Sequence, residues 1–196
     1  KDILGFPLTH TNNGWLNLDG SPEYVEILDN DLMSFGGSTG DKSFSLEAWI
    51  KMDSTAFFSI IGKGAWNVNA EWNLKVESGT LYFLIYDESV ASTQEYASYS
   101  SLSVNTWYHI VGTYDGRGGT SANAGMSLYV NGAGVTESLG GAGTYVAMEN
   151  LGADVYIGKF ESVYATGIID EVKIYHKELS AAEVTKNYKH GLSKHS

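Results

Sequence analysis

The stretch that decides the fold is Gly167-Ile168-Ile169-Asp170-Glu171-Val172-Lys173-Ile174-Tyr175-His176-Lys177-Glu178-Leu179-Ser180-Ala181-Ala182-Glu183-Val184. Between residues 168 and 175 the side chains alternate with a period of two, which indicates a β-strand. One of its two rows consists of Ile168, Asp170, Val172 and Ile174. Because that row is otherwise apolar, we expect it to face the core, where an unpaired carboxylate is costly. A bound cation is one natural partner for Asp170.

A short helix is predicted directly after this strand. Ser180 and Glu183 have the spacing of a capping box, with Ser180 as N-cap and Glu183 at the N3 position. Gly191 is a typical residue for the position just beyond a helix, so the helix should run to about Lys189. The last predicted strand is therefore followed by a short C-terminal helix.

Further short strands are predicted along the rest of the chain, joined by turns that contain glycine. Glu77-Ser78-Gly79 and Asn131-Gly132 are typical hairpin turns. The other expected strands cover residues 3–8, 24–28, 44–52, 57–61, 72–76, 81–86, 107–114, 126–130 and 155–159. No linker or low-complexity tract divides them. The sequence therefore predicts a single all-β domain over residues 1–196, built of two stacked antiparallel sheets.

The composition excludes several classes of partner. The 196 residues carry a formal net charge of −11, so no basic surface is expected for nucleic acid or for anionic membranes. No apolar run approaches the ~20 residues of a membrane-spanning helix, so membrane insertion is not expected. Cysteine is absent, which excludes disulfides and thiolate metal sites. Cations and neutral partners remain compatible with this charge.

Five segments of the chain, in order, resemble the laminin-G-like domains of the concanavalin A-like lectin/glucanase superfamily. They are Leu18–Ile27, Phe44–Lys51, Asn105–Gly116, Met126–Gly132 and Gly167–Tyr175. The resemblance implies a two-sheet antiparallel jelly-roll sandwich with one curved sheet, and ligands on the concave face or the loop rim. It also implies a structural calcium ion that ties the N-terminal region to the final strand. Carried over to this chain, the two carboxylates of that site are Asp19 and Asp170.

Two interpretations of these carboxylates remain open. Calcium takes six to eight oxygen ligands, and Asp19 and Asp170 would supply part of that set together with carbonyls near Gly20. Alternatively, Asp19 forms a turn with its own backbone before Gly20, and Asp170 accepts backbone N–H groups. We expect the calcium ion.

The second candidate site lies around residues 62–77, with Trp66 in a loop between strands. Sugars are bound by aromatic faces together with planar amides, and loops commonly carry such groups. Trp72 is in register with core residues, whereas Trp66 is the better candidate for exposure. Tyr82 and Tyr86 are expected in the solvent-facing row of the following hairpin. The predicted ligand-binding residues are Trp66, Asn67, Asn69, Tyr82 and Tyr86.

The sequence lacks the motifs of an enzyme. Glycosidases need paired carboxylates on one face of a strand, and no Glu-x-Asp-x-Glu pattern occurs in this chain. We therefore expect a non-catalytic, lectin-like module that binds a neutral glycan or polysaccharide. The alternative is a protein-interaction or structural adhesion module of a surface or particle assembly, with a protein partner. Because the chain begins at Lys1 rather than Met, we expect a processed piece of a larger exported protein, located outside the cell or on its surface.

Overall fold

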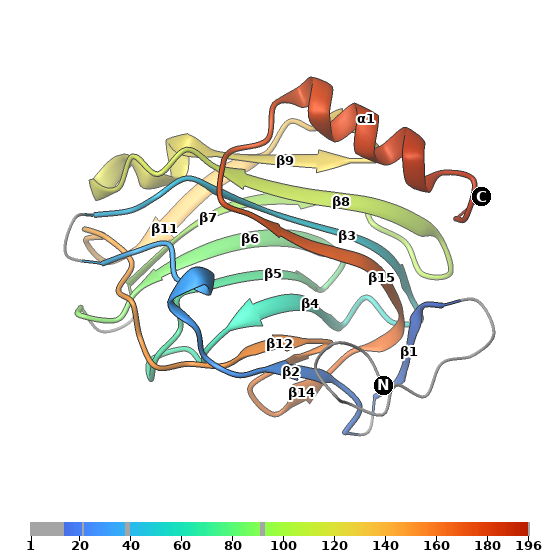
Figure 1. Cartoon of the computed structure of the whole chain (residues 1–196), viewed down its shortest axis with the longest axis horizontal. Helices are drawn as coiled ribbons and strands as arrows, with labels where there is room; N and C mark the ends of the chain where they lie inside the picture. The colour runs from blue at the N-terminus through green and yellow to red at the C-terminus, as the bar shows by residue number, and fades with distance from the viewer. Residues whose placement is uncertain (1–13, 21, 38–39, 91–92, 196) are drawn as a thin grey trace.

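The computed structural model describes residues 14–20, 22–37, 40–90 and 93–195, and in this part of the chain it is a sandwich of two antiparallel sheets (Figure 1). In spatial order, the six-stranded sheet consists of β1 (Leu16–Asp19), β15 (Thr166–Tyr175), β3 (Phe44–Met52), β8 (Trp107–Tyr114), β9 (Met126–Val130) and β10 (Ala133–Gly134). The seven-stranded sheet consists of β11 (Ser138–Ala142), β7 (Thr93–Ser100), β6 (Thr80–Asp87), β5 (Trp72–Glu77), β4 (Phe57–Lys63), β12 (Val155–Ile157) and β2 (Val25–Ile27). The jelly-roll prediction is confirmed.

Three helical segments and one small hairpin complete the described fold. They are η1 (Asp31–Met33), η2 (Gly119–Gly125), α1 (Ala181–Gly191) and the pair β13 (Lys159–Phe160) and β14 (Val163–Tyr164). The predicted capping box of α1 is present, with Ser180 and Glu183 bonded to each other's backbone N–H. None of the helices in these described ranges is both long and apolar enough to cross a bilayer.

The core lies between the two sheets and is built from the inward row of each strand. On β3 this row includes Phe44 and Leu46, and on β5 it includes Trp72 and Leu74, all without solvent exposure. Phe35 stacks on Phe44 with ring centroids 4.2 Å apart. Strand alternation therefore sends every second side chain of β5 and β6 to the outside of the sandwich.

Strands with strong apolar alternation lie where the sequence predicts them. Residues 44–52, 107–114 and 126–130 match β3, β8 and β9 at both ends. β1, β7 and β11 were not predicted, because their sequences are short or rich in serine, glycine and polar residues. The strand predicted at residues 3–8 lies outside the described residues.

The predicted inward row of β15 is wrong for its first two members, Ile168 and Asp170, and right for Val172 and Ile174, which pack against the core. Asp170 pairs with Trp49, but Lys173 pairs with Glu47, so β15 contains one extra residue. Within this bulge Glu171 has a φ of 49°. A bulge of this kind reverses the alternation, so Ile169 is buried before it and Val172 packs against the core after it. Asp170 therefore lies on the outer side of the sheet.

The outer side of the six-stranded sheet is covered by α1, which lies across it in Figure 1. A carboxylate, Glu47, is fully buried beneath the helix. Its oxygens accept hydrogen bonds from Lys173 Nζ at 2.6 Å, Asn187 Nδ2 at 2.7 Å and Tyr175 Oη at 3.1 Å. The Nε2 atom of His109 lies 3.4 Å from the same carboxylate. Asn187 belongs to α1, so its hydrogen bond to Glu47 fixes the helix on the sheet. The helix is thus positioned by polar donors that converge on one carboxylate.

A Glu47→Gln substitution tests this arrangement through its pH dependence. Burial raises the pKa of Glu47, but its contacts with His109, Lys173 and Asn187 outweigh burial and lower the pKa from 4.5 to about 2. The resulting stabilisation, about 3 kcal/mol, is complete above pH 4.5 and is lost as the pH falls through 2. In urea denaturation the free energy of unfolding of the wild type should exceed that of Glu47→Gln most at pH 7. The difference should shrink as the pH falls toward 2. A difference that does not change with pH would contradict this role.

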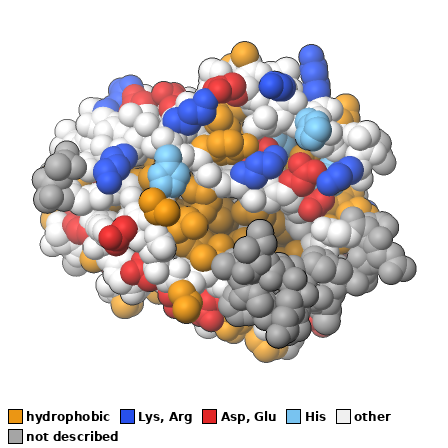
Figure 2. All heavy atoms as spheres, in the orientation of Figure 1, with side chains coloured by type: hydrophobic (Ala, Val, Ile, Leu, Met, Phe, Trp, Pro, Cys, Tyr) orange, Lys and Arg blue, Asp and Glu red, His pale blue; other side chains and the backbone are white. Residues whose placement is uncertain are grey.

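Figure 2 shows hydrophobic side chains gathered in the middle of the face seen in Figure 1, with charged side chains around them.

Candidate functional site

The outer side of the seven-stranded sheet carries a cavity of about 280 Å³, here called the aromatic groove. Its lining residues are Trp66, Lys75, Glu77, Tyr82, Leu84, Tyr86, Gln94, Tyr96 and Phe160. Five of these nine side chains are aromatic. The groove therefore combines ring faces with a few polar tips, a composition common in small-molecule sites.

Strand register brings the floor of the groove together. On β6, Leu81, Phe83 and Ile85 are buried in the core, so the residues between them face outward. Leu84 is directly opposite Tyr96 of β7. The rings of Tyr82 and Tyr96 meet edge to face, with centroids 5.7 Å apart.

The positive charge in the groove belongs to Lys75 and is compensated locally. Its Nζ atom lies 2.8 Å from Glu77 Oε2. The same ammonium lies 5.5 Å from the centroid of the Phe57 ring and 5.9 Å from that of Phe160. Ring faces at this range stabilise a cation. The groove thus presents a neutral ion pair, which suits an uncharged ligand better than an ionic one.

The Trp66 wall of the groove is positioned by carboxylates on two neighbouring loops. Trp66 N–H donates to Glu161 Oε1 at 3.3 Å, and Asn67 N–H donates to Glu88 Oε1 at 3.0 Å. Asn69 Oδ1 accepts the N–H of Ala65 at 3.1 Å, which closes the turn. The Trp66 side chain is 42% exposed, so its ring is available to a ligand.

The structure brings three of the five predicted ligand-binding residues into one cavity. Trp66, Tyr82 and Tyr86 all line the aromatic groove, whereas Asn67 and Asn69 do not. Tyr86 is 2% exposed, and burial, followed by the charges of nearby glutamates, raises the pKa of its hydroxyl. It therefore forms the neutral base of the groove.

Sequence reasoning missed part of the lining. Tyr96 and Gln94 were not placed because β7 lacks an aliphatic row, and Phe160 reaches the groove from the β13–β14 hairpin, which has only two residues in each strand. The alternation Gln94, Tyr96, Ser98 was the available signal for β7.

The structure does not bring Asp19 and Asp170 together. Asp19 pairs with Thr166 of β15, so Asp170 lies four residues, about 13 Å, farther along that strand. Asp170 Oδ1 accepts the N–H of Glu171 at 2.8 Å, and its Oδ2 lies 2.9 Å from Nε2 of His195. A calcium ion shared by both carboxylates does not fit this placement, and the backbone bond of Asp170 agrees with the alternative interpretation.

A double-mutant cycle tests whether the two carboxylates share an ion. Asp19→Ala and Asp170→Ala should change the free energy of unfolding additively, within about 0.5 kcal/mol, because they are far apart and share no ligand. The measurement is urea denaturation with calcium chloride and again with EDTA. A coupling energy that appears only with calcium would restore the shared site.

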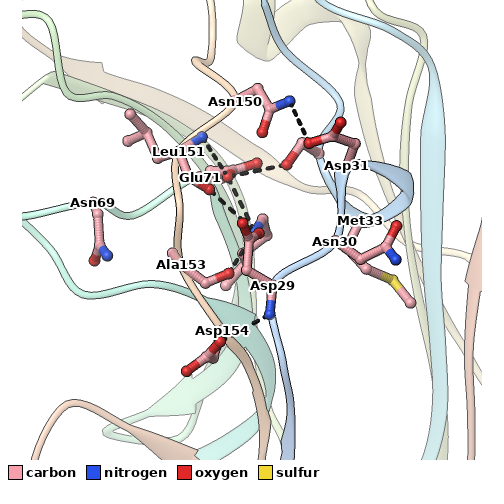
Figure 3. A network of polar contacts seen from close by, with 12 residues as sticks. Asp29, Asn30, Asp31, Met33, Asn69, Glu71, Asn150, Leu151, Ala153 and Asp154 are labelled. Carbon is pink, nitrogen blue, oxygen red and sulfur yellow. Dashed lines mark hydrogen bonds and ion pairs between the residues drawn. The ribbon is translucent and has the colours of Figure 1, made fainter.

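A buried lysine, Lys63, ties the loops at one end of the sandwich. Its partners Asp29, Glu71, Leu151 and Ala153 are labelled in Figure 3. Lys63 Nζ lies 2.5 Å from Asp29 Oδ1, 2.5 Å from the carbonyl oxygen of Ala153 and 3.3 Å from Glu71 Oε1. The carbonyl oxygen of Leu151 lies at 3.4 Å. The ammonium thus sits among four oxygens from three separate segments. Among the described residues, no three His, Cys, Asp or Glu side chains are grouped as a metal site.

Glu71 completes this network and titrates near neutral pH. Its Oε1 accepts the N–H of Leu151 at 2.9 Å and the hydroxyl of Ser34 at 3.1 Å. Burial raises the pKa of Glu71 from 4.5 to about 7, although the Leu151 bond and the nearby Lys63 oppose the shift. The protonated form is therefore favoured in the folded protein relative to the unfolded chain.

The pH dependence of stability follows from this shift. The contribution of Glu71 is complete below pH 4.5 and is lost as the pH rises through 7, so the protein should become less stable between pH 5 and pH 8. Glu71→Gln cannot ionise, so its urea midpoint should fall less over this range. If the urea midpoints of the wild type and the variant fall by the same amount over this pH range, ionisation of Glu71 is not the cause of the pH dependence.

Comparisons with known proteins identify the family. The family model Laminin_G_3, described as the concanavalin A-like lectin/glucanases superfamily, matches residues 15–185. A search of curated proteins finds no match.

Solved structures share the fold at low identity. The binding domain of botulinum neurotoxin serotype G has a TM-score of 0.64 at 15% identity, over 90% of this chain and 42% of that one. The receptor binding domain of the C/D mosaic serotype has a TM-score of 0.63 at 20% identity, over 92% of this chain and 44% of that one. The chain thus spans less than half the length of these proteins, and the likeness shows the fold alone.

Proposed function

The chain belongs to the concanavalin A-like lectin/glucanase superfamily, and we propose that it is a non-catalytic module that binds a neutral glycan in the aromatic groove. The observation that carries this proposal is the convergence of Trp66, Tyr82, Tyr96 and Phe160 on one outward cavity. Aromatic rings supply a large contact area at a low cost in conformational entropy, and the C–H faces of sugars match them. The superfamily and the binding domains that share its fold support a binding role.

The polar groups of the groove support an uncharged, hydroxyl-rich ligand. Gln94 offers an amide donor and acceptor, and the Lys75–Glu77 pair offers one donor and one acceptor without net charge. With a formal net charge of −11, the protein as a whole disfavours acidic glycans. A neutral polysaccharide meets both conditions.

The acidic residues support a binding role without hydrolysis. Glu77 is the one carboxylate among the described residues that line the aromatic groove, and it is paired with Lys75. Glycoside hydrolysis uses two carboxyl groups that flank the scissile bond. The groove has no second group in this position, so we propose no reaction for it. For a module of this kind we propose a location outside the cell or on its surface.

Loss of ring contacts provides the test. Trp66→Ala and Tyr82→Ala should each weaken binding at least about tenfold, equivalent to 1.4 kcal/mol, in affinity electrophoresis through gels containing xyloglucan, galactomannan, mixed-linkage β-glucan or dextran. Val68→Ala is the matched control, because Val68 is 72% exposed in the same turn and does not line the groove. The proposal fails if no neutral polysaccharide retards the wild type.

A second candidate function is interaction with another protein. It is favoured by the apolar side chains gathered on the face in Figure 2, because large exposed apolar patches commonly mark such surfaces. Sedimentation velocity separates the two functions. Self-association that Trp66→Ala leaves unchanged, together with no retardation in the gels, would favour a protein partner.

A further inference from the structure

A second cavity of about 250 Å³ lies next to the aromatic groove. Its lining residues are Gly64, Ala65, Asn69, Gly152, Ala153, Asp154, Tyr156, Lys159 and Glu161. Asn69, Ala153 and Asp154 are labelled in Figure 3, close to the network around Lys63. This second cavity is not part of the groove described above, since the two share no lining residue.

A thin ridge separates the two cavities. Trp66 lines the groove, whereas the preceding residue, Ala65, lines the second cavity. Likewise Phe160 lines the groove, whereas its neighbours Lys159 and Glu161 line the second cavity. The hydrogen bond from Trp66 N–H to Glu161 Oε1 joins the two sides of this ridge. Consecutive residues therefore line different cavities, and the two cavities adjoin at Trp66.

Their size favours one ligand unit in each cavity. Cavities for drug-sized ligands begin at about 300 Å³, and each of these two is smaller, at about 280 and 250 Å³. Two such cavities on either side of a narrow ridge suit a chain whose successive units occupy both.

The second cavity offers the same kind of contact as the groove, with more polar groups. Tyr156 provides a ring, with the Lys159 ammonium 4.3 Å from its centroid and 4.3 Å from that of Tyr24. No carboxylate in the described residues forms an ion pair with Lys159, so its N–H groups are free of salt bridges there. Asp154 and Asn69 add acceptors and an amide. These groups match the hydroxyls of a neutral sugar.

We propose that the aromatic groove and the second cavity are two subsites for one neutral polysaccharide chain, which crosses the ridge at Trp66. This inference rests on the proposed glycan-binding function and adds that the ligand is a chain longer than a disaccharide. Once one sugar unit is bound in the first cavity, the next unit of the same chain is held close to the second cavity. Its contacts there therefore raise the overall affinity of the chain.

Oligosaccharides of increasing length test the proposal. Disaccharide and hexasaccharide fragments of the polysaccharide that retards the protein most are titrated into the 196-residue chain by calorimetry. The hexasaccharide should bind at least about tenfold more tightly than the disaccharide. Tyr156→Ala should weaken hexasaccharide binding while disaccharide binding in the groove is retained. Trp66→Ala should weaken both.

Tyr164→Ala is the matched control, because Tyr164 lies beside Tyr24 but lines neither cavity. Lys159→Met is the second variant at the second cavity, should Tyr156→Ala alter the circular dichroism of the fold. Equal affinity for both fragments, or a hexasaccharide affinity that neither variant changes, overturns the two-subsite proposal and leaves glycan binding in the groove intact. If no neutral polysaccharide binds at all, both proposals fail.

Discussion

The aromatic groove depends on the burial of the inward rows of β5, β6 and β7. Trp72, Leu74 and Phe83 are completely removed from solvent, and each large apolar side chain buried in this way contributes about 1.5–3 kcal/mol. A shift of one residue in register would expose all of them, so the register is strongly specified. Once it is specified, Lys75, Tyr82 and the residues in line with them can only point outward. The geometry of the binding surface is therefore a consequence of core packing on the opposite side of the same strands.

The outer faces of the two sheets differ in how far their aromatic side chains are covered. On the six-stranded sheet, Trp49 is covered by Tyr188 of α1, stacked at 5.6 Å, and by His195, stacked at 4.2 Å. Its ring is only 1% exposed and is unavailable to a ligand. On the seven-stranded sheet Trp66 keeps 42% of its surface exposed. There Trp66 lines the aromatic groove together with four other aromatic side chains. The helix thus covers aromatic side chains on one face, whereas those of the groove on the other face have no helix over them.

The sequence predicted those parts of the fold in which a single strand carries a strong apolar period. It could not locate the bulge at Glu171, because an extra residue leaves no trace in the alternation until the partner strand is known, and the orientation of Asp170 was wrong for that reason. Three of the nine lining residues of the groove were predicted as ligand-binding, since Trp66 follows from its loop position and Tyr82 and Tyr86 follow from the hairpin register. Tyr96 was not, because its strand has no apolar row, and cross-strand neighbours depend on pairing between distant segments.

The rim of the sandwich is held by a charge that the chain itself supplies. An ammonium buried with carboxylates is stable only when its desolvation is offset by well-placed oxygens, and Lys63 has oxygens from Asp29, Glu71, Leu151 and Ala153 around it. A side-chain cation differs from a free ion in one respect: it cannot dissociate. The segment 151–154, part of which lines the second cavity, is consequently positioned by a cation that folding itself supplies, and with it one wall of the proposed sugar-binding surface.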